Sequence, residues 1–402
     1  MTLRKKVAYA RKVLPAATWT GLRRAASGAV HLIFALADHF EPAIDPSDGT
    51  KRVPRQEQER RLEQWGREYP RAAEKWLDHD GRPFVHTYFY PAEQYDEGLL
   101  GMLAEHCHRG WGEIEIHLHH GMAGGPDTAE NTRRLLTEFR DLLAFRHRSL
   151  SAEKGSSQPR YAFVHGNWAL ANSGGGRGCG VDSEMQILAE TGCYADMTLP
   201  TSVLNPAQIA KINSLYECAL PLSEAAPHRK GHDLTVGRAP RTFPLMIQGP
   251  LVIDVAGTMR RAKPAIENGA IVGSHPMTLA RLALWKRAQI RVAGRPDWLF
   301  IKLHCHGMDP RQQDEVVGAA FQSFLKDLTE GARDRKETLH FVTAREMTNI
   351  LLAACEGREG NPGDFRDYRF RRFAEVQPSP HDSGAGESAK KDSSAHPVGL
   401  KG

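Results

Sequence analysis

The sequence has 402 residues, of which 41% are hydrophobic and 25% are charged, and its formal net charge is +5. This composition is typical of a globular protein, and the length fits one large domain without requiring several. The mild positive charge comes with neither a zinc-finger spacing nor an aromatic–basic motif, so we expect no nucleic-acid partner. Six cysteines without a C-x-x-C pair indicate reduced thiols rather than a disulfide framework.

Residues 1–28 alternate basic and apolar side chains and are predicted to form a basic helical arm packed on the rest of the protein. The alternative is a helix lying on an anionic membrane surface, and Pro15 is expected to interrupt either helix. The segment lacks the apolar core of a signal peptide. No stretch reaches the ~18 apolar residues of a membrane span. We therefore expect a cytoplasmic protein, with contact at the inner membrane face as the alternative.

Short apolar runs rich in β-branched and aromatic residues predict strands at 30–37, 84–88, 113–118, 161–164, 194–199, 251–255, 298–303 and 339–342. Helical periodicity separates them at 99–106, 128–145, 183–190, 277–290, 312–328 and 344–354. Alternating strands and helices predict an α/β protein with a parallel sheet. The number of repeats favours a closed or nearly closed barrel.

One domain is expected over residues 29–375. Within it, the highly charged segment 51–79 predicts a surface helix, and 226–233 (APHRKGHD) predicts a solvated loop. Residues 376–402 are rich in Ser, Gly, Pro and charge, and they are predicted to be a disordered tail.

Histidine or aspartate recurs at successive predicted strand ends. Because the active sites of (β/α) barrels form at the carboxyl ends of the strands, these residues are candidates for a site. They are Asp38 and His39 after the first strand, His117, His119 and His120 after the third, His165, Asn167 and Trp168 after the fourth, Asp196 on the fifth, Asp254 on the sixth, and His304 and His306 after the seventh.

The densest pattern is three histidines within four residues, at His117, His119 and His120. Imidazole and carboxylate are the ligands that zinc prefers, and catalytic zinc sites use about three of them. Alternation along a strand points His117 and His119 to one face, whereas His120 faces that way if the strand ends at Leu118. We expect Asp38, His117 and either His119 or His120 to bind a divalent metal, with zinc as the first choice.

The catalytic roles are assigned to residues near this predicted metal. Either Asp38 or His165 would accept a proton from the attacking water, and His304 would protonate the leaving amine. Glu41, which precedes Pro42, is interpreted as a loop residue, and Asp254 as a helix cap. The weaker candidates are expected to contact substrate: His39, Asn167, Trp168, Asp196 and His306.

Three stretches, 34–40 (FALADHF), 112–121 (GEIEIHLHHG) and 300–307 (FIKLHCHG), resemble motifs of the polysaccharide deacetylase family, also called the NodB-homology domain. Segment 165–170 (HGNWAL) resembles the signature of a divergent branch of that family. The resemblance spans roughly residues 30–345. It implies a distorted (β/α) barrel, often of seven strands, and one zinc or similar ion held by an aspartate and two histidines. It also implies hydrolysis of an acyl bond, usually the N-acetyl group of a sugar.

The chain departs from the family pattern at three motifs. His165-Gly166-Asn167 stands where the family has an arginine-proline motif after the fourth strand. Asp38-His39 stands where the family has two adjacent aspartates, and His117 and His120 are three residues apart instead of four.

Two other functions stay open at this stage. A two-metal amidohydrolase acting on another C–N bond would use the H-L-H and H-C-H patterns at two strand ends. That class usually carries H-x-H on its first strand, which this chain lacks. A catalytically inactive barrel would instead bind a glycan or a partner, with Trp111, Trp168 and Trp285 as candidates for stacking on a sugar. For the hydrolase, the expected substrate is a carbohydrate or another small acylated amine.

Overall fold

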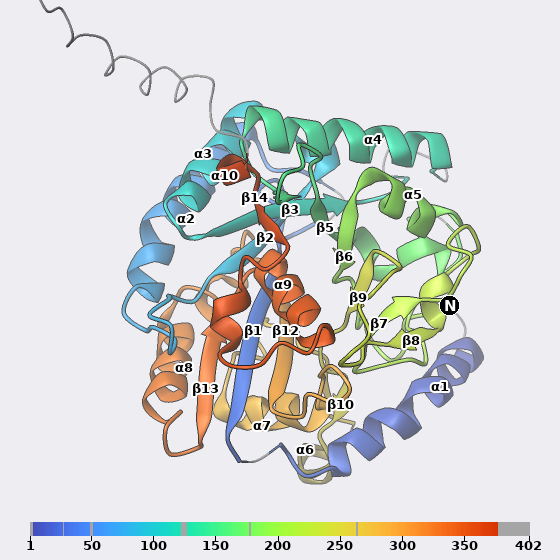
Figure 1. Cartoon of the computed structure of the whole chain (residues 1–402), viewed down its shortest axis with the longest axis vertical. Helices are drawn as coiled ribbons and strands as arrows, with labels where there is room; N and C mark the ends of the chain where they lie inside the picture. Colours follow the sequence, from blue (N-terminus) through green and yellow to red (C-terminus); the bar gives the residue numbers. More distant parts are fainter. Residues whose placement is uncertain are drawn as a thin grey trace, which may run out of the picture.

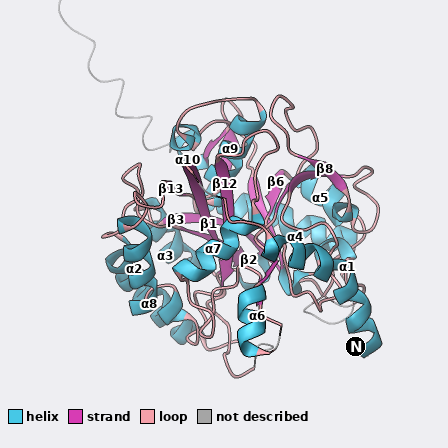
Figure 2. Ribbon diagram, turned by 90° about the horizontal axis from the view of Figure 1, so that it is seen from below, coloured by secondary structure: helices cyan, strands magenta, loops and turns pink. Residues whose placement is uncertain are grey.

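The computed structural model describes residues 3–26, 28–48, 51–121, 127–176, 178–262 and 264–376. A ten-stranded, mostly parallel sheet forms its centre, with helices packed around it (Figures 1 and 2). The strand order is β12-β1-β2-β3-β5-β6-β9-β7-β8, and β13 pairs with the first half of β1. The expected α/β class with a parallel sheet is confirmed. The path of paired strands is open between β12 and β8, so a closed barrel is not shown.

The strands of this sheet are β1 (Val30–His39), β2 (His86–Pro91), β3 (Gly112–Leu118), β5 (Tyr161–His165), β6 (Cys193–Asp196), β7 (Leu215–Cys218), β8 (Gly231–Asp233), β9 (Leu245–Ile247), β12 (Trp298–Cys305) and β13 (Glu337–Phe341). Two small antiparallel pairs are β10 (Val252–Ile253) with β11 (Ile266–Glu267), and β14 (Phe370–Arg372) with β4 (Ser151–Glu153). The α-helices are α1 (Leu3–Leu22), α2 (Arg55–Ala73), α3 (Glu97–His108), α4 (Ala129–Asp141), α5 (Glu184–Thr191), α6 (Val255–Arg261), α7 (Leu279–Ala288), α8 (Ala319–Glu330), α9 (Ala344–Cys355) and α10 (Phe373–Val376).

The sheet is buried on both faces, which explains the nearly continuous apolar run of β1. Leu32, Phe34 and Leu36 pack in one core with α2, α3, α4, α5 and α8, and we name this side the outer face. Ile33 and Ala35 pack in a second core with α9, and we name this side the inner face. Figure 1 shows α9 lying against β1 and β12. A Thr343–Glu346 capping box begins α9, and all of its residues are buried.

Most predicted strands are present within a few residues of their expected bounds, but the strand expected at 251–255 is wrong. Only Val252 and Ile253 are extended there, and they pair with β11 outside the main sheet. Asp254 instead caps α6, with its side chain accepting a hydrogen bond from the Gly257 N–H at 2.9 Å. The strand that occupies this place in the sheet is β9, whose three residues are too few to show a periodic pattern.

The basic N-terminal arm is helical, as expected, and α1 packs against β10, α6 and α7. Contrary to expectation, the helix continues through Pro15, because Val13 and Ala17 are buried on either side of it. None of the described helices is long and apolar enough to cross a membrane. The tail predicted from residue 376 lies outside the described residues from 377 onward.

The surface helix expected within 51–79 is present as α2, but one side of it is buried through Trp65 and Tyr69, which pack on the outer face.

All six cysteines lie in the described part of the chain, and no disulfide joins them.

Candidate metal centre

Three side chains meet on the inner face where β1 and β3 end. His39 is the last residue of β1, Glu41 follows two residues later, and His117 is on β3. One ligand atom from each lies within 4.8 Å of the other two. The rings of His39 and His117 are 5.0 Å apart between centroids, and Glu41 Oε1 is 3.6 Å from His117 Nε2. We name these three residues the inner cluster.

His117 is oriented as a metal-binding histidine is. Its Nδ1 lies 2.7 Å from the Val164 carbonyl oxygen, so Nδ1 carries the proton and donates it. Its Nε2 is buried and has no hydrogen-bond partner. A buried polar atom without a partner costs free energy, and metal ligands of this kind are usually fixed by a hydrogen bond at the opposite ring nitrogen. The inner cluster therefore offers Nε2 of His117 as a ligand atom.

The protonation states of the inner cluster suit a cation. Burial, followed by the nearby His119, lowers the pKa of His117. Burial and the neighbouring histidines hold the pKa of His39 well below its ordinary value. Burial alone would raise the pKa of Glu41, but His117 and His119 beside it bring that pKa to about 2. Two neutral imidazoles and one carboxylate are the state in which such groups bind a divalent metal.

Three further histidines surround the inner cluster. His119 is held by Glu93 Oε1, 2.7 Å from its Nδ1, and its Nε2 lies 3.7 Å from Glu41 Oε1. The rings of His304 and His306 lie 6.1 and 4.8 Å from that of His39. Burial, with Lys302 next, holds the pKa of His304 well below its ordinary value.

Asp38, the expected carboxylate ligand, lies on the outer face because neighbouring residues of a strand point to opposite sides. Its Oδ2 is 2.9 Å from His86 Nδ1, and its Oδ1 accepts a hydrogen bond from the Gly307 N–H at 2.7 Å. Asp38, His86 and Cys305 form a buried group of their own. The structure thus does not bring Asp38 to His117. Glu41, expected to be a loop residue, takes the place predicted for Asp38.

Asp38→Ala is expected to lower the free energy of unfolding by about 3 kcal/mol, because buried donors on His86 and Gly307 lose their acceptor. Metal content should stay unchanged. Urea unfolding and elemental analysis of the same preparation check this. Asp38→Asn, which keeps one acceptor oxygen, should cost less. Metal loss in both variants without loss of stability would return Asp38 to the ligand set.

His120 and His165, predicted as an alternative ligand and as a base, meet Glu184 in a second group on the outer face. Their ligand atoms lie within 4.8 Å of one another. His120 Nε2 is 2.7 Å from Glu184 Oε1, and His165 Nε2 is 3.5 Å from Glu184 Oε2. The two imidazole rings are stacked at 4.7 Å. We name these three residues the outer cluster.

A fourth group, Asp78, Asp80 and His340, is paired with the guanidinium of Arg366. One guanidinium nitrogen of Arg366 lies 2.9 Å from Asp78 Oδ2 and 2.8 Å from Asp80 Oδ2. This group is therefore an ion-pair network rather than a candidate for a metal.

The other predicted substrate contacts lie in different surroundings. Asp196 is buried and accepts hydrogen bonds from the N–H and hydroxyl of Thr198, and burial raises its pKa to about 7. Asn167 is exposed and donates to the Gly178 carbonyl oxygen at 3.4 Å. The side chain of Trp168 lies outside the described part of the structure. Of the weaker candidates, His39 belongs to the inner cluster and His306 contacts it.

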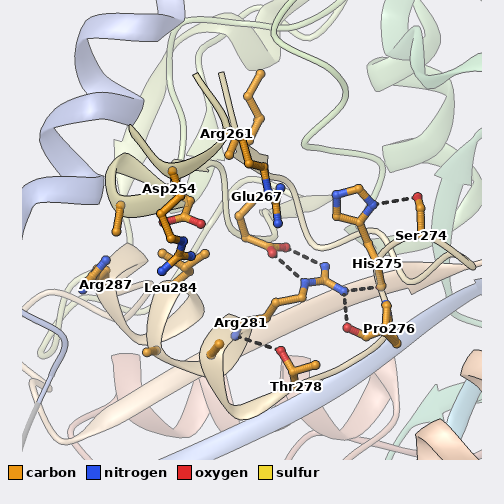
Figure 3. A pocket seen from close by; sticks show the side chains of 16 residues that line it. Asp254, Arg261, Glu267, Ser274, His275, Pro276, Thr278, Arg281, Leu284 and Arg287 are labelled. Carbon is orange, nitrogen blue, oxygen red and sulfur yellow. Dashed lines mark hydrogen bonds and ion pairs between the residues drawn. The ribbon is translucent and has the colours of Figure 1, made fainter. Parts of the chain in front are cut away.

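A separate pocket of about 370 Å³ opens between α6, β11 and α7 (Figure 3). Arg281 crosses it and pairs with Glu267 at 2.7 Å. The pocket is also lined by three more arginines, Arg260, Arg261 and Arg287, and by one more carboxylate, that of Asp254. The lining is thus net positive, and it includes no residue of the inner cluster.

Comparison with known proteins adds no family assignment. No model of a known protein family matches the chain, and no curated protein matches it significantly. The resemblance to polysaccharide deacetylases therefore stays a prediction.

Proposed function

We propose that the protein is a metal-dependent hydrolase of the polysaccharide deacetylase type, removing an N-acetyl or similar acyl group from a sugar or another small amine. The observation that carries the proposal is the buried Nε2 of His117, which makes no hydrogen bond and lies 3.6 Å from Glu41 Oε1, with His39 beside it. Two imidazoles and a carboxylate are a donor set of catalytic zinc sites, which leave a position open. We therefore propose zinc as the ion.

A divalent ion held by the inner cluster would supply the Lewis acidity that amide hydrolysis requires. His119 is the better proton donor to the leaving amine, because Glu93 fixes its Nδ1 and its side chain is 15% exposed. His304 is less suited to that role, since its buried imidazole is neutral at neutral pH. We assign proton acceptance to His306, whose half-buried ring lies beside His39, because Asp38 and His165 face away.

The two-metal amidohydrolase is less favoured. Such enzymes hold their ions about 3.5–4 Å apart. Here the inner cluster uses His117 on one face of the sheet, whereas His165 of the outer cluster lies on the other face. The inactive, ligand-binding barrel stays as an outcome of the test.

The test combines elemental analysis of the purified chain with acetate release from N-acetylated sugars. We expect a bound divalent ion, and acetate release that stops on chelation and returns with zinc. His232→Ala, at an exposed histidine, is the control for nonspecific effects. Folded protein that takes up no offered metal would overturn the hydrolase and favour the binding barrel. Metal uptake without acetate release from any sugar would overturn the proposed substrate class.

A further inference from the structure

The outer cluster joins three elements that are far apart in the sequence. His120 follows β3, His165 ends β5, and Glu184 begins α5. The three side chains are at most 1% exposed. Burying a carboxylate between two imidazoles costs free energy unless its charge is compensated, so this arrangement calls for a specific explanation.

Both histidines are fixed through the ring nitrogen that faces away from Glu184. Nδ1 of His120 lies 2.9 Å from Asp127 Oδ2, and Nδ1 of His165 donates to the Gly166 carbonyl oxygen. Both Nε2 atoms therefore point toward the Glu184 carboxylate. The chain of carboxylate, histidine and metal is the usual way in which proteins orient a metal ligand.

An ion pair between His120 and Glu184 would not explain the position of His165, the third residue of the outer cluster. The Nε2 of His165 is buried, makes no hydrogen bond, and lies 3.5 Å from Glu184 Oε2. It has the same surroundings as Nε2 of His117 in the inner cluster: a proton fixed at Nδ1 and a free lone pair aimed at a carboxylate.

The chain also keeps space open between these atoms. A Cβ at Gly180 would lie 2.5 Å from Glu184 Oε2 and 2.8 Å from His165 Nε2. Gly180 has a φ of +73°, a conformation that favours glycine in any case. The glycine thus leaves room beside the ligand atoms that any other residue would fill.

His228 is a further buried histidine in this part of the molecule. Both of its ring nitrogens are buried without hydrogen-bond partners. Burial, with Arg229 next, lowers its pKa to about 3, and Glu184 and His165 are among the groups that act on it. The solvated loop expected for 226–233 is therefore wrong at His228, which the structure buries.

We propose that His120, His165 and Glu184 form a second metal site for a divalent cation of the zinc type. Two imidazoles and a carboxylate are ligands that zinc prefers. The ion would also stabilise the loops that carry Ala171 and Ala226. Ala171 N–H donates to Glu184 Oε2 at 2.6 Å, and Ala226 N–H donates to the Ala171 carbonyl oxygen at 3.0 Å. Fixing Glu184 therefore fixes both loops. This site does not depend on the proposed function.

The test counts zinc per chain in the full-length protein after saturation with Zn²⁺ and removal of excess. We expect His165→Ala and Glu184→Gln each to bind one ion fewer than wild type. The result depends on the difference in zinc per chain between wild type and variant, not on the total. Wild type binds two ions if the inner cluster also binds zinc, and one ion if it does not. Failure of the proposed function is therefore distinguishable from failure of this site.

Gly180→Ala is the second variant, because it keeps all three ligands and places a methyl group beside two of them, with some backbone strain at the positive φ. It should also bind one ion fewer, and Co²⁺ should lose the visible absorption of one tetrahedral site. Circular dichroism without metal shows which variants fold, and any one folded variant is sufficient for the comparison. Equal zinc in wild type and in a folded variant would overturn the site.

Discussion

His117→Ala should remove one bound ion from the protein and reduce turnover by about 10³-fold or more. The reason is that Nε2 of His117 is buried, has no hydrogen-bond partner, and lies beside the two other ligand groups of the inner cluster. Loss of a group that merely orients a ligand costs about 10–100-fold in metal affinity. Loss of the ligand itself should cost more, and the Lewis acidity is lost with the ion.

The measurement is zinc content and acetate release on matched preparations of wild type and variants. Glu41→Gln, which keeps the shape of the side chain, should lose the same ion. His119→Ala should keep that ion and lose turnover, because we assign His119 to proton donation. Asp38→Asn distinguishes this ligand set from the one expected from the sequence, and it should keep the ion. Full zinc content and full activity in His117→Ala would place the ion elsewhere.

The position of the inner cluster was predictable from sequence because parallel strands end at one edge of a sheet. The runs that became β1, β3 and β12 are long and apolar, and His117 stands at the end of one of them. What could not be predicted was the face. The first strand was expected to end at Ala37, whereas β1 extends to His39. Neighbouring residues of a strand point to opposite sides, so His39 rather than Asp38 joins the inner cluster.

The glutamates were missed for two different reasons. Glu41 precedes Pro42 and resembles a loop residue, although a spacing of two from His39 places both on one side of an extended chain. Glu184 carries no local signal, because only the packing of α5 brings it to His120 and His165. The expected closure of the strands is not shown, and the number of strands was underestimated because very short strands, such as the three residues of β9, carry no periodic pattern.

Arg345→Met should lower the free energy of unfolding at neutral pH by about 3–5 kcal/mol. Arg345 of α9 is only 2% exposed and lies 2.7 Å from Glu113 Oε1, near the start of β3. It also donates to the Phe370 carbonyl oxygen at 2.9 Å. The substitution leaves the largely buried Glu113 carboxylate with the more exposed Arg372, at 3.3 Å, as its cationic partner and with the Thr343 hydroxyl, which donates to it at 2.9 Å.

The loss of unfolding free energy in Arg345→Met should depend on pH, and the direction of that dependence identifies its cause. In wild type, burial alone would raise the pKa of Glu113, but Arg345 brings it below the ordinary 4.5. The pair therefore stabilises the fold above about pH 4.5, and this contribution is lost as the pH falls. Without Arg345, burial raises the pKa of Glu113 above 4.5. The variant should then lose stability as the pH rises through 4.5, because the unfolded state releases its proton first.

The difference in unfolding free energy between wild type and Arg345→Met should accordingly be largest near pH 7 and shrink toward pH 4. Urea unfolding at several pH values measures it. Adding Glu113→Gln to Arg345→Met should recover much of the loss at pH 7, because it removes the uncompensated charge. A loss of equal size at every pH would mean that Arg345 acts through its hydrogen bonds to the backbone. Because β3 carries both Glu113 and His117, a loss that is largest near pH 7 would also mean that α9 fixes the strand of His117 by charge.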